Sequence, residues 1–188
     1  MDFEVGDIVA FSTEAQTGKI IRRLQRRLFG VGGWTEINHV AVCIQVPDIL
    51  REAHVPKSSI RSNRTVKGRR VVAVAKPLYT EEKLDPDGLK EFMVSQLEII
   101  GQWYGLLQLV GIVFVYWLDV LGVRLKRNPI RAGRICVEDV VHWKYDLEKH
   151  CGVWDGMNEQ LEDIDGVYPG QLFKILDESD LYFVKWYE

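Results

Sequence analysis

Residues 38–46, with the sequence NHVAVCIQV, form the most clearly patterned stretch of this chain. Apolar and β-branched residues run through it without interruption, which is typical of a buried β-strand. Pro47 and Asp48 supply a turn after it, and residues 49–55 then have the character of a returning strand. The two segments together predict an antiparallel β-hairpin.

Segments on both sides of this hairpin are also regularly patterned. Residues 19–29 carry apolar side chains on one side of a predicted helix and arginines on the other. The other expected elements are strands at 5–11, 71–75 and 182–186 and helices at 81–101, 105–123 and 136–148. Most strands thus come early in the chain and most helices late, which predicts an α+β fold with helices packed against an antiparallel sheet.

Length and composition indicate a single globular domain over residues 1–188. The 188 residues are 47% hydrophobic and 27% charged, and no linker or repeat divides them. A net charge of −3 gives no indication of nucleic-acid binding. Three cysteines do not make a disulfide scaffold, and the first residues lack the pattern of a secretory signal peptide. We therefore expect a protein of a reducing compartment, with free thiols.

Residues 105–123 (GLLQLVGIVFVYWLDVLGV) are almost wholly apolar. Their number approaches the ~20 residues that a membrane-spanning helix needs. Gln108 and Asp119 interrupt the segment, and basic residues follow at 124, 126 and 127. These features favour a buried or interfacial helix over a membrane span and leave contact with a membrane surface open.

The segment 134–145 (RICVEDVVHWKY) places Cys136 at the start of a predicted helix. Glu138 and Asp139 follow in the first turn, where acidic side chains interact favourably with the helix dipole. A helix amino terminus also stabilises a thiolate, the form in which cysteine acts as a nucleophile. A small buried cysteine that packs the helix start would give the same pattern, so local chemistry leaves both interpretations open.

A nucleophilic cysteine needs a base, and the chain has four histidines. His142 lies six positions further along the same predicted helix and so cannot face Cys136. We expect His150 to be exposed near the end of that helix. His39 and His54 lie on the two strands of the predicted hairpin. A polar ring at the start of so apolar a strand suggests a specific role for His39, with a simple bond to a backbone carbonyl as the alternative.

The sequence gives little support for a metal or another cofactor. A zinc site would have to combine ligands whose spacing does not match the paired ligands of structural zinc sites, namely Cys136, His142, His150 and Cys151. The chain also has no glycine-rich phosphate loop before a helix and no GxSxG motif. We therefore expect neither a metal nor another cofactor.

Six short motifs are spread over nearly the whole chain. Each is a weak signal alone, but their order along the chain is significant. They are GDIVAF at 6–11, NHVAVCI at 38–44, REA at 51–53, GQWYG at 101–105, ICVEDV at 135–140 and VYPGQLF at 167–173. This ordered set resembles the permuted NlpC-like family of papain-like cysteine amidases and peptidases, the YaeF/YiiX type. The sequence departs from the family's usual pattern at Val137, where a small hydroxyl residue is common, and at Asp139, where an apolar one is common.

The resemblance implies a circularly permuted papain-like fold, in which the histidine strand precedes the cysteine helix. It makes Cys136 the nucleophile, His39 the general base, Glu52 the residue that orients the imidazole and Tyr104 a hydroxyl that lines the active site. It also implies a hydrolase that cleaves an amide bond, such as that of a peptidoglycan peptide, through an acyl-enzyme. A cytoplasmic or phage-associated location would fit a protein with no signal peptide.

Strand pairing argues against Glu52 in this role. If Val46 pairs with Ile49 across a two-residue turn, Glu52 falls opposite Cys43, about four residues along the strand from His39. At ~3.4 Å per residue, that separation is too long for a hydrogen bond. A different turn or a strongly twisted hairpin would be required, and an ordinary surface glutamate is the alternative.

Two other functions would use the same sequence features. A lipid acyltransferase or thioesterase would use the Cys136–His39 pair, with residues 105–123 in contact with lipid. A binding module would keep the fold without turnover. The basic residues of segment 61–70 would suit an anionic substrate or lipid head group, although such runs are usually solvated. The expected partners are thus a peptide, amide or acyl-lipid substrate and no nucleic acid, with the oligomeric state open.

Overall fold

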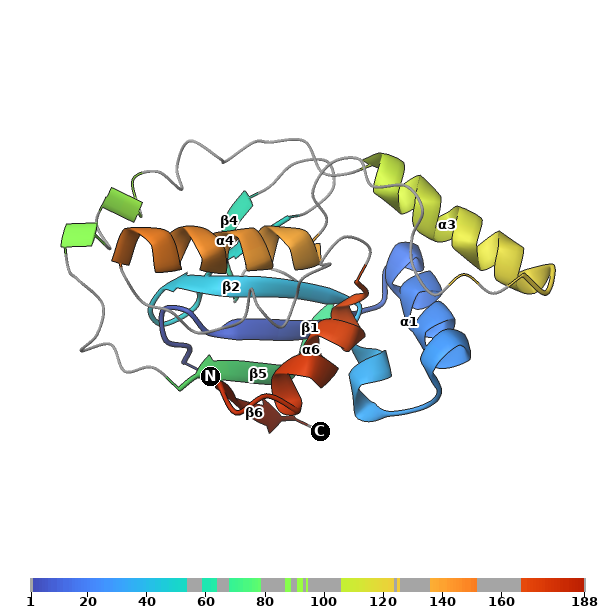
Figure 1. Cartoon of the computed structure of the whole chain (residues 1–188), viewed down its shortest axis with the longest axis horizontal. Helices are drawn as coiled ribbons and strands as arrows, with labels where there is room; N and C mark the ends of the chain where they lie inside the picture. The colour runs from blue at the N-terminus through green and yellow to red at the C-terminus, as the bar shows by residue number, and fades with distance from the viewer. Residues whose placement is uncertain are drawn as a thin grey trace.

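A computed structural model gives the fold of the chain (Figure 1). It describes residues 2–53, 59–63, 68–78, 87–88, 91–92, 94, 106–123, 125, 136–151 and 167–187.

The centre of the fold is a six-stranded sheet with the strand order β4-β3-β2-β1-β5-β6, in which every neighbouring pair is antiparallel. The predicted antiparallel sheet and its packing against helices are therefore confirmed. The hairpin proposed from residues 38–55 is present as β2 and β3. The strands are β1 (Ile8–Thr13), β2 (His39–Gln45), β3 (Ile49–Glu52), β4 (Ser59–Ser62), β5 (Arg69–Pro77) and β6 (Tyr182–Trp186).

Two helices cover one face of the sheet, α4 (Cys136–Cys151) and α6 (Pro169–Asp177) (Figure 1). Apolar side chains of α4 recur at three- and four-residue spacing and enter the main core, as a helix with one buried face requires. They meet alternate side chains of β1 and β2, such as Ile8 and Val42, which point to this face. The core thus holds α4 in a fixed orientation on the strands.

A second helical pair lies at one end of the molecule. Helix α1 (Gln16–Phe29) packs against α3 (Leu106–Val120) through a cluster that includes Ile21, Leu24, Ile112 and Val115. The buried Asp119 of α3 pairs with Arg27 of α1, with 2.6 Å between carboxylate oxygen and Nε. This ion pair explains the acidic residue within the apolar segment 105–123. Among the described residues, no helix is long and apolar enough to cross a membrane.

Several boundaries differ from the expectations. The strand expected at 5–11 begins at Ile8, because Gly6 has a φ of 93° and residues 5–6 form a turn. Strand β4 is not among the expected strands, because its residues SIRS are too polar for the pattern of a buried strand. Helix α3 ends before Gly122, which has a φ of 87°. Of the helix expected at 81–101, the structure describes only residues 87, 88, 91, 92 and 94, and these are helical.

The motif VYPGQLF builds the start of α6. Buried Gln25 of α1 donates to the Ile37 carbonyl at 2.7 Å and accepts from the Gly170 backbone N–H at the same distance. A Cβ on Gly170 would lie 2.3 Å from the Trp34 carbonyl oxygen, so only glycine fits at this position. Pro169 occupies the first helical position, where its missing N–H costs nothing. One amide side chain thus joins α1, the segment before β2 and α6.

Candidate functional site

The nucleophile predicted from the sequence lies where it was expected, because α4 begins at Cys136. The beginning of α4 lies beside the beginning of β2 in Figure 1. Asp139, in the first turn of α4, accepts two hydrogen bonds from Arg51 of β3, at 2.7 and 3.3 Å. Both side chains are buried, so this bidentate pair fixes the first turn of the helix to the sheet.

His39 and Glu52 are in direct contact. The Nε2 atom of His39 lies 2.8 Å from the Oε2 atom of Glu52, and the Glu52 side chain is 1% exposed. The sequence-based objection to Glu52 is therefore wrong, and so is the surface alternative. The turn between the strands is one residue longer than expected, because Gln45 pairs with Ile49, and a bulge between Cys43 and Gln45 shifts the register by one more residue, so that Cys43 pairs with Leu50. In that register Glu52 falls opposite Ala41, diagonally across from His39 on the same face of the sheet.

The ring of His39 interacts with both Cys136 and Glu52. Burial lowers the pKa of His39, but a hydrogen bond with Cys136, a hydrogen bond with Glu52 and the negative charges of both partners raise it to about 9. Since Glu52 occupies Nε2, Nδ1 is the ring nitrogen left for the sulfur. The three side chains therefore form one chain of contacts from Glu52 through His39 to Cys136.

Arg69 of β5 is a fourth member of the site that the sequence did not reveal. Its NH1 atom lies 2.8 Å from the same Glu52 oxygen that contacts His39, and its side chain is only 4% exposed. The guanidinium carbon also lies 4.2 Å from the ring centre of Phe11, which packs near His39. In the sequence Arg69 belongs to the basic segment 61–70, and no spacing or motif distinguishes it from its basic neighbours there. Strand pairing alone brings it to Glu52.

The remaining residues with reactive or titratable side chains either lie outside the described part of the chain or are not part of the site. Tyr104 and His54 lie outside the described residues, so their roles stay predictions. His142 is exposed on α4, six positions after Cys136. Cys43 is buried, and burial raises the pKa of its thiol to about 12, which makes it unreactive. Among the described residues, no group of three or more His, Cys, Asp or Glu side chains could hold a metal ion.

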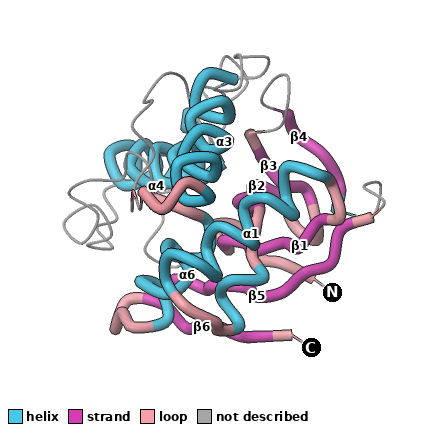
Figure 2. Tube along the Cα trace, turned by 90° about the vertical axis from the view of Figure 1, so that its right-hand side faces the viewer, coloured by secondary structure: helices cyan, strands magenta, loops and turns pink. Residues whose placement is uncertain are grey.

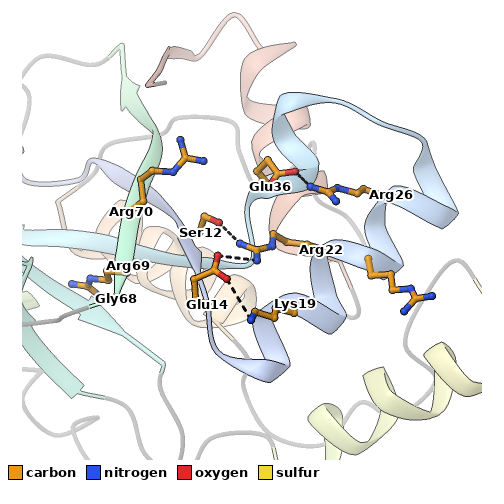
Figure 3. A pocket seen from close by; sticks show the side chains of 10 residues that line it. Ser12, Glu14, Lys19, Arg22, Arg26, Glu36, Gly68, Arg69 and Arg70 are labelled. Atoms are coloured by element: carbon orange, nitrogen blue, oxygen red, sulfur yellow. Dashed lines mark hydrogen bonds and ion pairs between the residues drawn. The ribbon is translucent and has the colours of Figure 1, made fainter.

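A hollow of about 790 Å³ lies between α1 and the strands β1 and β5 (Figure 3). Six of its ten lining residues are basic, namely Lys19, Arg22, Arg23, Arg26, Arg69 and Arg70. Glu14 and Glu36 are its acidic members, and each pairs with a basic neighbour from α1. The hollow therefore has an excess of positive charge.

Comparisons with known proteins give no further identification: no family model, no curated protein and no solved structure matches this chain.

Proposed function

We propose that this protein is a cysteine hydrolase with Cys136 as the nucleophile, His39 as the general acid–base and Glu52 as the residue that positions the imidazole. The observation that carries the proposal is the continuous contact from Glu52 through His39 to Cys136, at the first residue of a helix. A buried histidine with a pKa of about 9 is an imidazolium at neutral pH, and it stabilises a neighbouring thiolate.

The proposed reaction proceeds in two steps. The Cys136 thiolate attacks the substrate carbonyl carbon, and the negative charge moves to the carbonyl oxygen near the backbone N–H groups that begin α4. His39 then donates its proton to the leaving amine or alcohol as the carbon–heteroatom bond breaks, which leaves an acyl-enzyme. In the second step neutral His39 takes a proton from water, and the hydroxyl group displaces the sulfur. The acyl group leaves as a carboxylic acid, and the Cys136 thiolate and the His39 imidazolium are regenerated.

Arg69 has a defined role in this scheme. Without Arg69, the full negative charge of Glu52 would neutralise the His39 imidazolium. The imidazolium would then interact less strongly with the Cys136 thiolate. Because Arg69 contacts the same Glu52 oxygen, part of the carboxylate charge is already neutralised. The imidazolium is then left with the Cys136 thiolate as its second counter-ion. Arg69 is thus a positioning residue that acts through Glu52.

We propose the circularly permuted papain-like arrangement as the fold. In its support, the histidine strand β2 precedes the cysteine helix α4 in the chain, and α4 packs on the antiparallel sheet that carries the histidine. Catalytic roles depend on geometry and are independent of the order of the residues in the chain.

An amide bond, such as that of a peptidoglycan peptide or related amide, is the preferred substrate. An acyl-lipid ester is the second candidate, and the exposed apolar side chains of α3 favour it specifically. Both substrates would give the same acyl-enzyme on Cys136. Intact-mass measurement after mixing with a muropeptide or with a phospholipid would identify which compound transfers its acyl group to the protein.

Alkylation by iodoacetamide at a series of pH values tests the nucleophile without knowledge of the substrate. We expect Cys136 to react well below the pH that an ordinary thiol needs, while buried Cys43 serves as an unreactive internal control. Peptide mass spectrometry assigns the modified residue. If Cys136 reacted only above pH ~8, as an unperturbed thiol does, the chain would be a binding module with the fold of an enzyme.

A further inference from the structure

The exposed side of α3 is apolar from residue 110 to residue 121. Val110, Phe114, Trp117 and Leu121 recur at three- and four-residue spacing and so form one stripe, which we call the α3 ridge. Trp117 is 60% exposed and Leu121 is 75% exposed. The opposite side of the helix packs on α1 through Ile112 and Val115, so α3 has two apolar faces and only one of them is covered.

No exposed charge interrupts the ridge. Asp119 is the only charged residue between positions 110 and 123, and it is buried against Arg27 of α1. Arg23 of α1 lies over the ring of Tyr116, with 5.7 Å between the guanidinium carbon and the ring centre. The acid of α3 is thus neutralised, and cations of α1 lie along the border of the ridge.

The basic side of α1 continues from this border into the hollow. Figure 2 looks onto this side of the molecule and shows α1 and α3 next to each other in front of the sheet. Lys19, Arg23, Arg26 and Arg27 of α1 are exposed, and Arg70 of β5 lies on the other wall of the hollow (Figure 3). An apolar strip beside a basic strip therefore occupies one side of a protein whose net charge is −3.

We infer that this side of the molecule docks on a lipid bilayer that contains anionic phospholipids. The α3 ridge would enter the boundary between head groups and acyl chains, and the basic residues of α1 would contact the phosphates. The apolar ridge and the basic residues beside it together favour a bilayer, because stable attachment to a membrane combines apolar burial with electrostatic attraction to anionic lipids. A purely apolar contact with a protein would cover the ridge but would leave the basic strip of α1 without anionic partners.

The docked orientation would place the proposed nucleophile close to the membrane. Helices α1 and α3 lie at the same end of the molecule as the beginning of α4, where Cys136 is located (Figure 1). The inference does not depend on the catalytic proposal, since a chain without turnover would present the same surface. If the proposed function holds as well, an acyl lipid becomes the favoured substrate class.

Sedimentation of the full chain with phosphatidylcholine vesicles, with and without phosphatidylserine, tests this inference. We expect binding that requires phosphatidylserine and weakens as salt is raised. The double variant Phe114→Ser/Trp117→Ser should bind roughly tenfold more weakly or worse, because each side chain loses apolar burial in the bilayer. The variant Lys19→Gln/Arg23→Gln should lose affinity for anionic vesicles only.

A matched control separates the ridge from general surface hydrophobicity. Phe183 of β6 is 59% exposed, like Trp117, but belongs to the far edge of the sheet, so Phe183→Ser should bind as the unmodified chain does. Circular dichroism shows whether each variant is folded, and Cys136→Ala should bind normally. Failure to sediment with anionic vesicles would overturn the inference. Self-association in the absence of lipid that Phe114→Ser/Trp117→Ser abolishes would also overturn it, because the ridge would then be covered by a second copy.

Discussion

Arg51 and Glu52 are neighbours on β3, yet each belongs to a different buried ion cluster. Successive residues of a strand point to opposite faces of a sheet, so Arg51 reaches α4 and Glu52 reaches His39. The first cluster is closed, because Arg51 and Asp139 neutralise each other with two hydrogen bonds. The second is open, because Glu52 has Arg69 and His39 as partners and the imidazole in turn contacts the Cys136 thiol.

Strand β3 thus takes part in two different interactions. The Arg51–Asp139 pair fixes the position of α4, and the contacts of His39 with Glu52 and Cys136 raise the pKa of the histidine. If this division is correct, substitutions in the two clusters will change different measured quantities.

Replacing His39 with Gln should give the largest loss. A general acid–base contributes roughly 10²–10⁴-fold to a reaction rate, so alkylation of Cys136 at pH 6 and hydrolysis of an activated model ester should both fall strongly. The free energy of unfolding, measured with urea, should change little by comparison. A variant that kept the alkylation rate of the unmodified chain would show that the imidazole does not activate the thiol.

Breaking the closed pair with Asp139→Asn should lower the free energy of unfolding by about 3–5 kcal/mol, because Arg51 keeps a buried charge without its partner. The double variant Arg51→Met/Asp139→Leu removes both charges and should recover most of the loss. Urea denaturation of the three proteins measures this effect. Equal destabilisation by the single and double variants would mean that the helix needs the ion pair itself.

Replacing Glu52 with Gln should move the pKa of His39 down from about 9 toward its ordinary value near 6.5, because one hydrogen bond to the imidazolium and one negative charge are lost. Between these two pH values the native ring is protonated, and the ring of the variant should lose its proton. Within that pH range Cys136 alkylation should then fall, by roughly tenfold for each unit by which the pKa of His39 is lowered. NMR titration of the His39 ring, one of four in the chain, measures the shift.

Replacing Arg69 with Gln should have the smallest effect and the opposite sign. The Glu52 carboxylate then has one cation fewer, so it interacts more strongly with the imidazolium, and the pKa of His39 should rise further. The same NMR titration measures this shift, with Arg70→Gln on the neighbouring β5 position as the control. A downward shift would contradict the role proposed for Arg69.

Local pattern predicted much of the fold, whereas the contacts in the site depend on how distant segments pack. The uninterrupted apolar strand at 38–46 and the helix that begins at Cys136 follow from local pattern, and both were confirmed. The contact between His39 and Glu52 could not be derived from spacing, because it depends on a three-residue turn and on a bulge between Cys43 and Gln45 that no local signal indicates. Only the resemblance to a family singled out Glu52.

Two further features depend on long-range packing. Arg69 reaches Glu52 because β5 and β3 lie on opposite sides of the β1–β2 pair, an arrangement that only the complete sheet establishes. The role of Asp139 as a partner of Arg51 likewise depends on where α4 docks. On the sequence alone Asp139 appeared to be an ordinary acidic residue at a helix start, which is a sufficient local explanation.

His39 and Cys136 are separated by more than half of the chain, and this separation has a consequence for biosynthesis. A ribosome delivers β1, β2, β3 and β5 long before α4, so the histidine and its carboxylate are made well before the thiol. Until α4 docks, Cys136 has no imidazole beside it. If Cys136 is the proposed nucleophile, the order of the elements along the chain delays its activation until most of the polypeptide has been synthesised.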